Sequence, residues 1–353
     1  MTMRFLTIFL AFLASISAVS AAELRGPLGN PATPVSGIAL SDSERQTIRQ
    51  GGYKAALVWH GSSTWVNALT AGAKAAFDEL GIRLVGQTDA QFDPAKQASD
   101  LENVMALEPD MILTLVIDGA SVKSSFDKAV KAGAELVLLS NPISGYQPGR
   151  EYVGIVTDDM QGMGVAAAEL MAEAVPGGGN IGVIYHDADY FITNTRDRAF
   201  MNAIDSGEHG AFSVKAKRGF TKESETSSIA SAMVLQYPML EAVYVSWDAA
   251  AEGVIAGLRA AGRPDIKVIT HDLGVNNLVD MAMGGNLYAS VADRPYEIGY
   301  AMALLGAYGI LDKPAPAFSV VGFDKVRRDS IAQVWQSTYH TPLPPLLQRA
   351  LQQ

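Results

Sequence analysis

Apolar runs of four to seven residues alternate with longer amphipathic segments over most of the chain after Lys54. The short runs are typical of buried strands, and the longer segments are typical of helices with one apolar face. Such regular alternation predicts βα units and hence a parallel sheet. The expected strands are 55–59, 83–86, 111–116, 135–139, 152–156, 181–185, 212–217, 242–245, 268–271 and 288–292. The expected helices are 65–80, 94–107, 122–132, 161–174, 195–206, 223–236, 250–261 and 296–311.

The first residues of the chain predict export. Arg4 is followed by the apolar run 5–16 and then by the small residues of 17–22. This order is typical of a cleavable signal peptide, and about 12 apolar residues are too few to span a bilayer. We therefore expect 1–22 to be a cleavable signal peptide and the mature protein to be exported. Residues 23–53, which begin rich in Gly, Pro, Asn and Thr, are expected to be a flexible lead-in.

Composition narrows the class of protein further. The chain has no cysteine, so its stability is expected to come from an apolar core and not from disulfides. Asp and Glu number 37 against 27 Lys and Arg, and the formal net charge of −10 argues against a nucleic-acid partner. The apolar segment 298–311 carries three glycines and is expected to be a buried helix, so we expect no stable membrane insertion after cleavage. The remaining length suits two domains of roughly 100–150 residues each.

Aromatic and polar residues gather where the predicted strands end. Open α/β sheets bind ligands at the carboxyl ends of their strands. Aromatic rings stack on the apolar faces of sugar rings, while Asp, Asn and Arg hydrogen-bond hydroxyl groups in fixed directions. The combination predicts a site for a small, neutral, polyhydroxylated ligand. The candidate ligand-binding residues are His60, Ser63, Trp65, Asn141, Tyr190, Phe191, Arg196, Trp247, Asp272 and Asp293.

Several of these residues also have an ordinary structural interpretation. Ser63 and Asp248 are well placed to cap the helices that follow them, and Asn141 can start a turn before Pro142. Trp65 and Trp247 lie where loops become helices, which favours ligand contact over burial in the core.

No pattern of residues predicts a cofactor, a metal site or catalysis. The histidines lack a short ligand spacing, so hydrogen bonding is preferred over a metal site. The glycines 177–179 follow a helix instead of a strand, the reverse of a dinucleotide-binding loop. No nucleophile elbow, phosphate-binding loop or zinc-protease motif is present, so we do not expect an enzyme.

The chain resembles the periplasmic sugar-binding proteins of ABC importers, of the ribose- and galactose-binding type, from Lys54 to about Val321. The features that carry this resemblance are Trp65 with Gly72-Ala73, Thr157-Asp158-Asp159, Arg196, Trp247-Asp248, Ala260-Ala261-Gly262, Asp272 and Asp293-Arg294-Pro295. The chain departs from ribose-binding proteins after the fourth strand, where Ser140-Asn141-Pro142 replaces a usual Asp-Arg pair. That departure argues against ribose itself.

The resemblance implies a type I periplasmic binding fold with two doubly wound α/β domains joined by three crossings. The first domain would comprise 54–156 and 293–320, and the second 157–292 and 321–353, with crossings near 156–157, 292–293 and 320–321. The resemblance also implies that Trp65 stacks on a sugar and that Arg196 binds ring hydroxyls. Asp272 and Asp293 would hydrogen-bond further hydroxyl groups of the ligand. Trp247 stands where ribose-binding proteins often have Asn, so Trp65 and Trp247 are expected to sandwich the ligand. Residues 326–353, expected to be one helix and a proline-rich tail, lie beyond the resemblance.

The expected function is to capture a monosaccharide or polyol between the domains, as a monomer, and to deliver it to an ABC permease. Two alternatives remain open at this point. One is an exported sugar-active enzyme, and the other is a ligand sensor that signals to a chemoreceptor or sensor kinase. A repressor core of the same fold would need an N-terminal helix-turn-helix, and the predicted signal peptide stands in its place.

Overall fold

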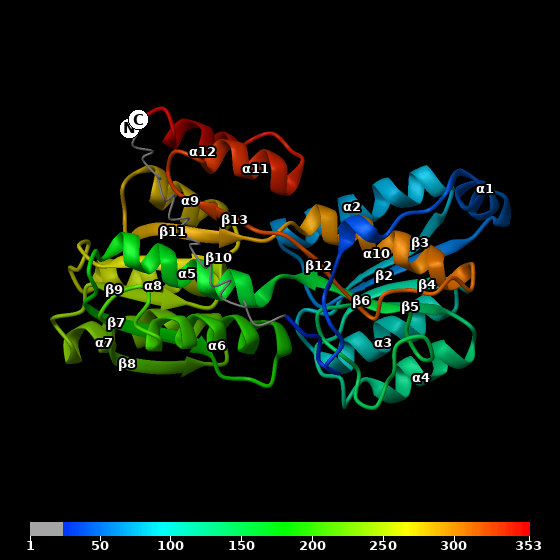
Figure 1. The fold of residues 1–353 in the computed structure, drawn as a ribbon, viewed down its shortest axis with the longest axis horizontal. Coiled ribbons are helices and arrows are strands. Elements are labelled where there is room, and N and C mark those ends of the chain that lie inside the picture. The colour runs from blue at the N-terminus through cyan, green and yellow to red at the C-terminus, as the bar shows by residue number, and fades with distance from the viewer. Residues whose placement is uncertain (1–23) are drawn as a thin grey trace, which may run out of the picture.

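The computed structural model describes residues 24–353, which form two α/β domains joined near the middle of the molecule (Figure 1). The predicted signal peptide, 1–22, lies outside the described residues. Each domain is a mainly parallel sheet with helices on both faces, which confirms the predicted fold class. Within residues 24–353, none of the helices is both long and apolar enough to cross a membrane.

The first domain contains a seven-stranded sheet in the order β1-β12-β6-β5-β4-β2-β3, in which every pair of neighbours is parallel. Its strands are β1 (Thr33–Pro34), β2 (Lys54–Trp59), β3 (Arg83–Asp89), β4 (Met111–Leu115), β5 (Glu135–Leu139), β6 (Gly154–Asp158) and β12 (Phe318–Val321). Its helical segments are η1 (Val35–Gly37), α1 (Asp42–Gly51), α2 (Thr64–Leu80), α3 (Pro94–Met105), α4 (Lys123–Lys131) and α10 (Pro295–Ile310).

Strand β2 shows why a continuous apolar run forms the centre of this sheet. Leu57 and Trp59 pack into the apolar cluster under α2 and α10, whereas Ala56 and Val58 pack into the cluster under α3 and α4. Successive side chains point to opposite faces of a strand, so a strand covered on both faces must be apolar at every position. Helices α2 and α10 pack closely because a Cβ on Gly299 would lie only 1.9 Å from the Leu69 carbonyl oxygen.

The second domain contains a six-stranded sheet in the order β13-β11-β10-β9-β7-β8, in which only β13 is antiparallel to its neighbour. Its strands are β7 (Asn180–His186), β8 (Ser213–Phe220), β9 (Ala242–Val245), β10 (Lys267–His271), β11 (Leu287–Ala292) and β13 (Asp324–Val326). Its helical segments are α5 (Met160–Ala174), α6 (Phe191–Asp205), η2 (Glu223–Glu225), α7 (Thr226–Gln236), α8 (Asp248–Ala260) and α9 (Val275–Ala282).

The chain passes between the two sheets three times. It leaves the first sheet after Asp158, at the end of β6, and enters α5. It returns after Ala292, at the end of β11, and enters α10, which packs on the first sheet. It crosses again between β12 and β13, over Gly322 and Phe323. The carboxyl ends of β6 and β11 therefore meet at the junction of the domains.

Three of the local expectations that differ from the structure concern the lead-in, the tail and helix α6. The composition of the lead-in, 23–53, predicts a flexible segment, but β1 pairs with β12 and α1 begins with a capping box in which Ser41 and Glu44 bond each other's backbone N–H. The capping-box spacing outweighs the loop-like composition before it. The tail after β13 forms two helices, α11 (Ile331–Tyr339) and α12 (Pro345–Ala350), instead of one.

The third difference concerns helix α6. It begins at Phe191, earlier than the expected start at 195, and Tyr190 at its N-cap makes no side-chain capping bond. The β-branched residues at 192, 193 and 195 have low helix propensity, which hides the first turn from a sequence pattern. Arg196 therefore lies in the second turn and not at the start of the helix.

Candidate ligand-binding site

Arg196 of α6 is the centre of a buried charged cluster at the junction of the domains. Its Nη2 pairs with Asp158 and lies 3.9 Å from a carboxylate oxygen of Asp293, and its Nη1 lies 3.3 Å from Asp272. Arg196 is 3% exposed, so these pairs are shielded from water. Three carboxylates around one guanidinium leave an excess of negative charge.

The cluster retains hydrogen-bonding capacity that the described residues do not use. Within residues 24–353, Nε of Arg196 and Oδ1 of Asp158 are buried without a hydrogen-bond partner. Burial raises the pKa of Asp293, and the neighbouring carboxylates raise it further. Burial also raises the pKa of Asp272. A ligand that offers hydroxyl groups can both donate to carboxylates and accept from the guanidinium.

The backbone around Asp272 holds its carboxylate toward Arg196. Asp272 has a φ of +66°, a left-handed conformation that Asp tolerates better than most residues. The Asp272 N–H donates to the Val291 carbonyl oxygen at 2.9 Å, and Ser290 Oγ donates to the Asp272 carbonyl oxygen at 2.6 Å. The hydroxyl of Tyr339, in the tail, donates to the next carbonyl oxygen, that of Leu273, at 3.2 Å.

Trp65 contributes to the site from the first domain. Its Nε1 donates to both carboxylate oxygens of Asp293, at 2.9 Å each, so the indole is fixed beside the charged cluster. The ring of His60, at the end of β2, lies edge-on to Trp65 with centroids 6.3 Å apart. Burial lowers the pKa of His60 to about 4, so at neutral pH this ring is uncharged.

Trp247 belongs to a second aromatic group, in the second domain. Its Nε1 donates to Glu223 Oε1 at 2.6 Å. Its ring lies 4.9 Å from that of His186 and 4.8 Å from that of Phe220. These contacts hold Trp247 at the carboxyl ends of β7, β8 and β9, as the sequence position predicts. Stacking on a ligand stays a prediction for both tryptophans.

Asp248 does not cap helix α8 as expected. Trp247 is the N-cap residue, and Asp248 is the first helical residue, with its Oδ1 accepting from the Ala249 N–H at 2.7 Å. Burial, together with the smaller effect of the Asp272 charge, raises the pKa of Asp248 to about 8. Asp248 is therefore a further acidic group beside the cluster. The sequence analysis did not predict this position, because it interpreted Asp248 as a helix cap.

Tyr190 and Phe191 connect the two domains across the site. Both precede or begin α6 of the second domain, yet both pack against the apolar clusters of the first. The next residue, Ile192, is 7% exposed and lies within the first domain's core cluster. The second domain therefore contacts the first beyond the three crossings.

The remaining two candidates have clear structural contacts. Ser63 caps α2, with its Oγ accepting from the Val66 N–H at 3.1 Å. Asn141 Nδ2 donates to the Val116 carbonyl oxygen at 2.9 Å, while within the described residues its Oδ1 is buried without a partner. Asn141 therefore retains one acceptor that a ligand could use, whereas Ser63 is engaged as a cap.

Behind Arg196, Asp197 anchors a buried polar network. Its two carboxylate oxygens accept from Tyr244 Oη and Ser246 Oγ at 2.8 Å each. The same Tyr244 oxygen lies 3.0 Å from His271 Nε2. Burial raises the pKa of Asp197 to about 6 and lowers the pKa of His271. This network links β9 and β10 to α6 and so fixes the helix that carries Arg196.

The sequence interpretation named Arg196, Asp272 and Asp293 as candidate ligand-binding residues, and the structure brings them together. It named Asp158 only as a mark of the family resemblance, although Asp158 completes the cluster. The apolar pattern ends the fifth strand at 156, which hides the position of Asp158 at the strand's carboxyl end. In residues 24–353, no group of three or more His, Asp or Glu side chains is arranged to hold a metal ion.

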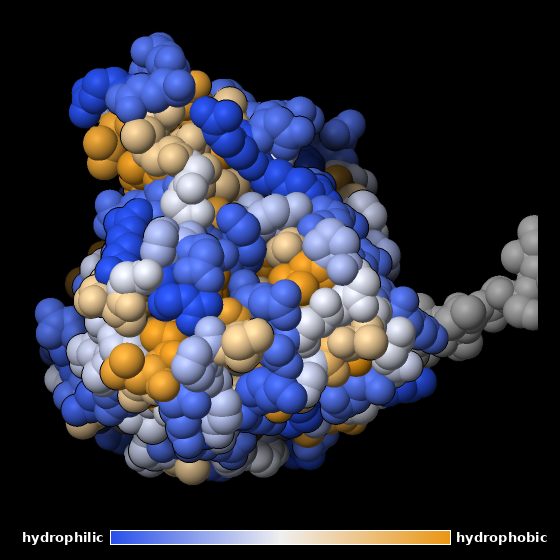
Figure 2. All heavy atoms as spheres, turned by 90° about the vertical axis from the view of Figure 1, so that its left-hand side faces the viewer, coloured by the Kyte–Doolittle hydropathy of each residue, from blue (hydrophilic) through white to orange (hydrophobic). Residues whose placement is uncertain are grey.

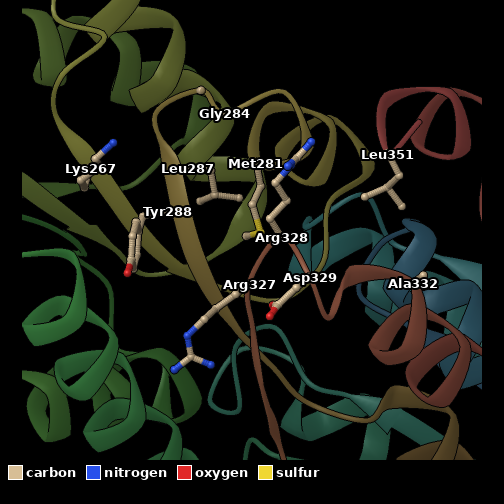
Figure 3. Close-up of a pocket in the computed structure, with 11 residues that line it drawn as sticks. Lys267, Met281, Gly284, Leu287, Tyr288, Arg327, Arg328, Asp329, Ala332 and Leu351 are labelled. Atoms are coloured by element: carbon tan, nitrogen blue, oxygen red, sulfur yellow. The ribbon is translucent and has the colours of Figure 1, made fainter. Parts of the chain in front are cut away.

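A separate hollow of about 700 Å³ lies at the opposite edge of the second sheet, where β10 and β11 begin (Figure 3). Lys267, Tyr288, Arg327 and Arg328 line it, and none of the predicted site residues does. On the end of the molecule formed by the second domain, apolar side chains gather in small groups among polar ones (Figure 2). Neither feature resembles the aromatic and acidic site at the domain junction.

Residues 54–309 match the family model described as periplasmic binding protein domain. The chain therefore belongs to the periplasmic binding protein domain family. The ribose import binding protein of Escherichia coli is 24% identical over 273 residues, which cover 76% of this chain and 88% of that protein. The D-ribose/D-allose-binding protein of Pseudomonas aeruginosa is 23% identical, over 57% of this chain and 63% of that protein.

Solved structures share the fold. An ABC transporter solute-binding protein from Agrobacterium vitis, bound with α-D-tagatopyranose, has a TM-score of 0.73 at 22% identity, covering 81% of this chain and 99% of that one. The arabinose-binding protein of Geobacillus stearothermophilus has a TM-score of 0.70 at 22% identity, covering 80% of this chain and 98% of that one.

Proposed function

We propose that this protein is the periplasmic solute-binding component of an ABC importer. It closes on a monosaccharide or polyol between its domains and delivers the ligand to a membrane permease. The observation that carries the proposal is the Arg196–Asp158–Asp272–Asp293 cluster, which lies at the domain junction with Trp65 bonded to it. The names of several relatives, which concern ribose, arabinose and tagatose, support a carbohydrate as the ligand class.

Within this class, we propose ligands other than ribose. Ribose-binding proteins usually carry an Asp-Arg pair after the fourth strand, where this chain has Ser140 and Asn141. Ser140 Oγ lies 2.7 Å from Thr157 Oγ1 and is fully buried, so it makes a contact within the protein instead of offering a charge. We propose that ring stacking on Trp65 and Trp247 compensates for the missing charged pair.

We propose a binding role without catalysis, for a monomer in the periplasm. Closure around a ligand would form a surface from both domains that the permease recognises. Recovery of any bound sugar unchanged after prolonged incubation with the protein is the expected result. Conversion of the sugar to another compound would instead support the alternative of a sugar-active enzyme.

A thermal-shift screen of the mature protein against pentoses, hexoses and polyols tests the ligand class. A ligand that binds only the folded state stabilises it by RT ln(1 + [L]/Kd), which is about 2.7 kcal/mol at a hundredfold excess over Kd. We expect at least one neutral carbohydrate or polyol to raise Tm, with binding confirmed by calorimetry. If none does, while a charged amino acid or a metal ion raises Tm, the proposal is wrong.

A further inference from the structure

The C-terminal tail, residues 327–353, contacts both domains. Helix α11 contacts α2 and α10 of the first domain, and α12 contacts α9 of the second. Trp335 and Tyr339 are each 2% exposed and lie in the second domain's apolar cluster, and Ala68 of α2 belongs to the same cluster. In Figure 1, α11 and α12 lie above α9 and β13 of the second domain, and one end of α11 points toward the first domain. The tail is therefore a connection between the domains in addition to the three crossings.

A stacked ring pair joins the tail to the first domain. The ring of His340, at the end of α11, lies 3.9 Å from that of Tyr296 with an angle of 7° between the planes. Tyr296 is in the first turn of α10, directly after the crossing that contains Asp293. His340 also has a φ of +53°, so the residue ends α11 in a left-handed conformation. The pair can persist only while the tail and α10 keep this relative position.

On its other side, the tail supports the candidate site. Tyr339 Oη donates to the Leu273 carbonyl oxygen at 3.2 Å. This carbonyl follows Asp272, whose left-handed backbone must be held by its surroundings to persist. The Leu273 side chain is 1% exposed and packs in the same cluster as Tyr339. Tyr339 thus contacts the loop that carries Asp272 in the second domain. Its neighbour His340 contacts the first turn of α10 in the first domain.

We propose that the C-terminal tail is a strap across the domain junction, in which His340 stacked on Tyr296 favours the closed form and Tyr339 positions the loop that presents Asp272. The strap makes Tyr339 and His340 positioning residues for ligand binding. A protein whose binding-competent form is only partly populated binds with an affinity reduced by that fraction. Loss of the strap therefore weakens binding and speeds ligand release without removing any group from the site. The inference rests on the proposed function only for the identity of the ligand.

The first test compares His340→Asn with His340→Phe. Asn tolerates the left-handed backbone but lacks a ring, whereas Phe keeps a ring that can stack on Tyr296. We expect His340→Asn to raise the ligand dissociation rate about two- to tenfold, the range for losing an aromatic pair. His340→Phe should restore most of the parent rate. Equal rates in His340→Asn and the parent would overturn the proposed role of the stack.

A ligand-free measurement separates this proposal from the proposed function. Small-angle X-ray scattering of the sugar-free protein should give a larger radius of gyration for His340→Asn than for the parent. The same result is expected for Tyr296→Leu, and the double variant should add little because each change breaks the same contact. If the radius is unchanged in all three variants, the tail is not a strap, whatever ligand the protein binds. If the radius rises but no carbohydrate binds the parent, only the proposed function fails.

Tyr339→Phe tests the positioning of the Asp272 loop. It keeps the buried ring and removes the hydroxyl that donates to Leu273, so we expect an affinity loss of about two- to tenfold, the range for one hydrogen bond. Trp335→Phe is the matched control, because the Trp335 indole bonds the Pro342 carbonyl oxygen within the tail. Trp335→Phe should lower Tm and leave the affinity unchanged. If Trp335→Phe weakens binding as much as Tyr339→Phe, the role of Tyr339 is packing and the positioning role is wrong.

Discussion

Arg196 is the residue on which the site depends most, and the structure changes what its removal should do. The sequence analysis expects Arg196 only to bind ring hydroxyls of the ligand. In the structure, Arg196 is buried and balances carboxylates that are also buried. We therefore expect Arg196 to stabilise the fold as well as to bind the ligand.

Arg196→Ala should abolish binding and also destabilise the fold, because it leaves Asp158 buried without its positive partner. Removal of one member of a buried ion pair typically costs about 3–5 kcal/mol. Urea unfolding measures this cost. Adding Asp158→Asn to the variant should recover part of the stability, because the orphaned charge is gone. An unfolding free energy equal in the single and double variants would contradict this account.

Asp197 is expected to make stability depend on pH. Burial raises its folded-state pKa to about 6, above the ordinary value of 3.8. A raised carboxyl pKa means that its stabilising contribution is complete below about pH 4 and is lost as pH rises to about 6. The loss is on the order of 3 kcal/mol, because each tenfold change in proton affinity corresponds to about 1.4 kcal/mol.

Asp197→Asn keeps an oxygen for Ser246 and removes the titration. Urea unfolding of the parent and the variant between pH 4 and pH 7 checks this prediction. The parent should lose stability relative to the variant as pH rises through this window. Parallel pH profiles for the two proteins would show that Asp197 does not titrate there.

Trp247 should contribute to binding through its ring face. Its indole N–H is already donated to Glu223, so replacement by Phe removes that bond but keeps a flat apolar surface. We expect Trp247→Phe to weaken binding modestly and Trp247→Ala to weaken it severely, as measured by calorimetry. Parent-like affinity in Trp247→Ala would make Trp247 a packing residue and place the ligand elsewhere along the strand ends.

At the scale of elements, the packing of α2 on α10 fixes where Trp65 and Asp293 meet. Helix α2 begins one residue before Trp65, and α10 begins two residues after Asp293. The two helices touch at glycines because a Cβ on Gly72 would lie 1.9 Å from the Tyr296 carbonyl oxygen. Close helix contact therefore brings Trp65 and Asp293 within hydrogen-bonding distance.

Gly299→Ala should force these helices apart, since its Cβ would lie 1.9 Å from the Leu69 carbonyl oxygen. We expect a loss of unfolding free energy of at least about 1–3 kcal/mol, the usual cost of overpacking, and weaker sugar binding. Gly37→Ala is the control, because the nearest atom to its Cβ would be 4.0 Å away. A parent-like Tm for Gly299→Ala would show that the helices can separate at little cost.

At the scale of the whole molecule, the proposed function requires one domain to move relative to the other about the three crossings. Tyr190 and Phe191 of the second domain pack against the first. Opening must break those contacts, so the ligand and the interdomain contacts together set the closed population.

Addition of a bound sugar should reduce the radius of gyration and change tryptophan fluorescence, because closure takes Trp65 and Trp247 out of water. Small-angle scattering and emission spectra of the same samples measure both effects. A protein with Trp247→Phe should retain the compaction and lose part of the fluorescence change. Binding without either change would mean that the site does not lie between moving domains.

The sequence by itself determined the fold class. A strand buried on both faces must be apolar at every position, as 55–59 is. A helix that covers a sheet must have one apolar face. The order of strands and helices can therefore be predicted from the pattern of apolar residues. The ends of those strands then indicated Arg196, Asp272 and Asp293, because parallel strands bring their carboxyl ends to one edge.

Only the tertiary structure decided which buried charged groups pair with each other and where the C-terminal tail packs. Asp158 joins Arg196 through a contact between residues far apart in sequence, and no local pattern reports such a contact. For Asp248, a local role as a helix cap explains the sequence equally well, so its place beside the cluster stays hidden. The placement of His340 on Tyr296 follows from how a tail packs across two domains, which depends on the complete surface of both. Local periodicity fixes elements, whereas pairing of buried charges and docking of a tail depend on neighbours that only the folded chain brings together.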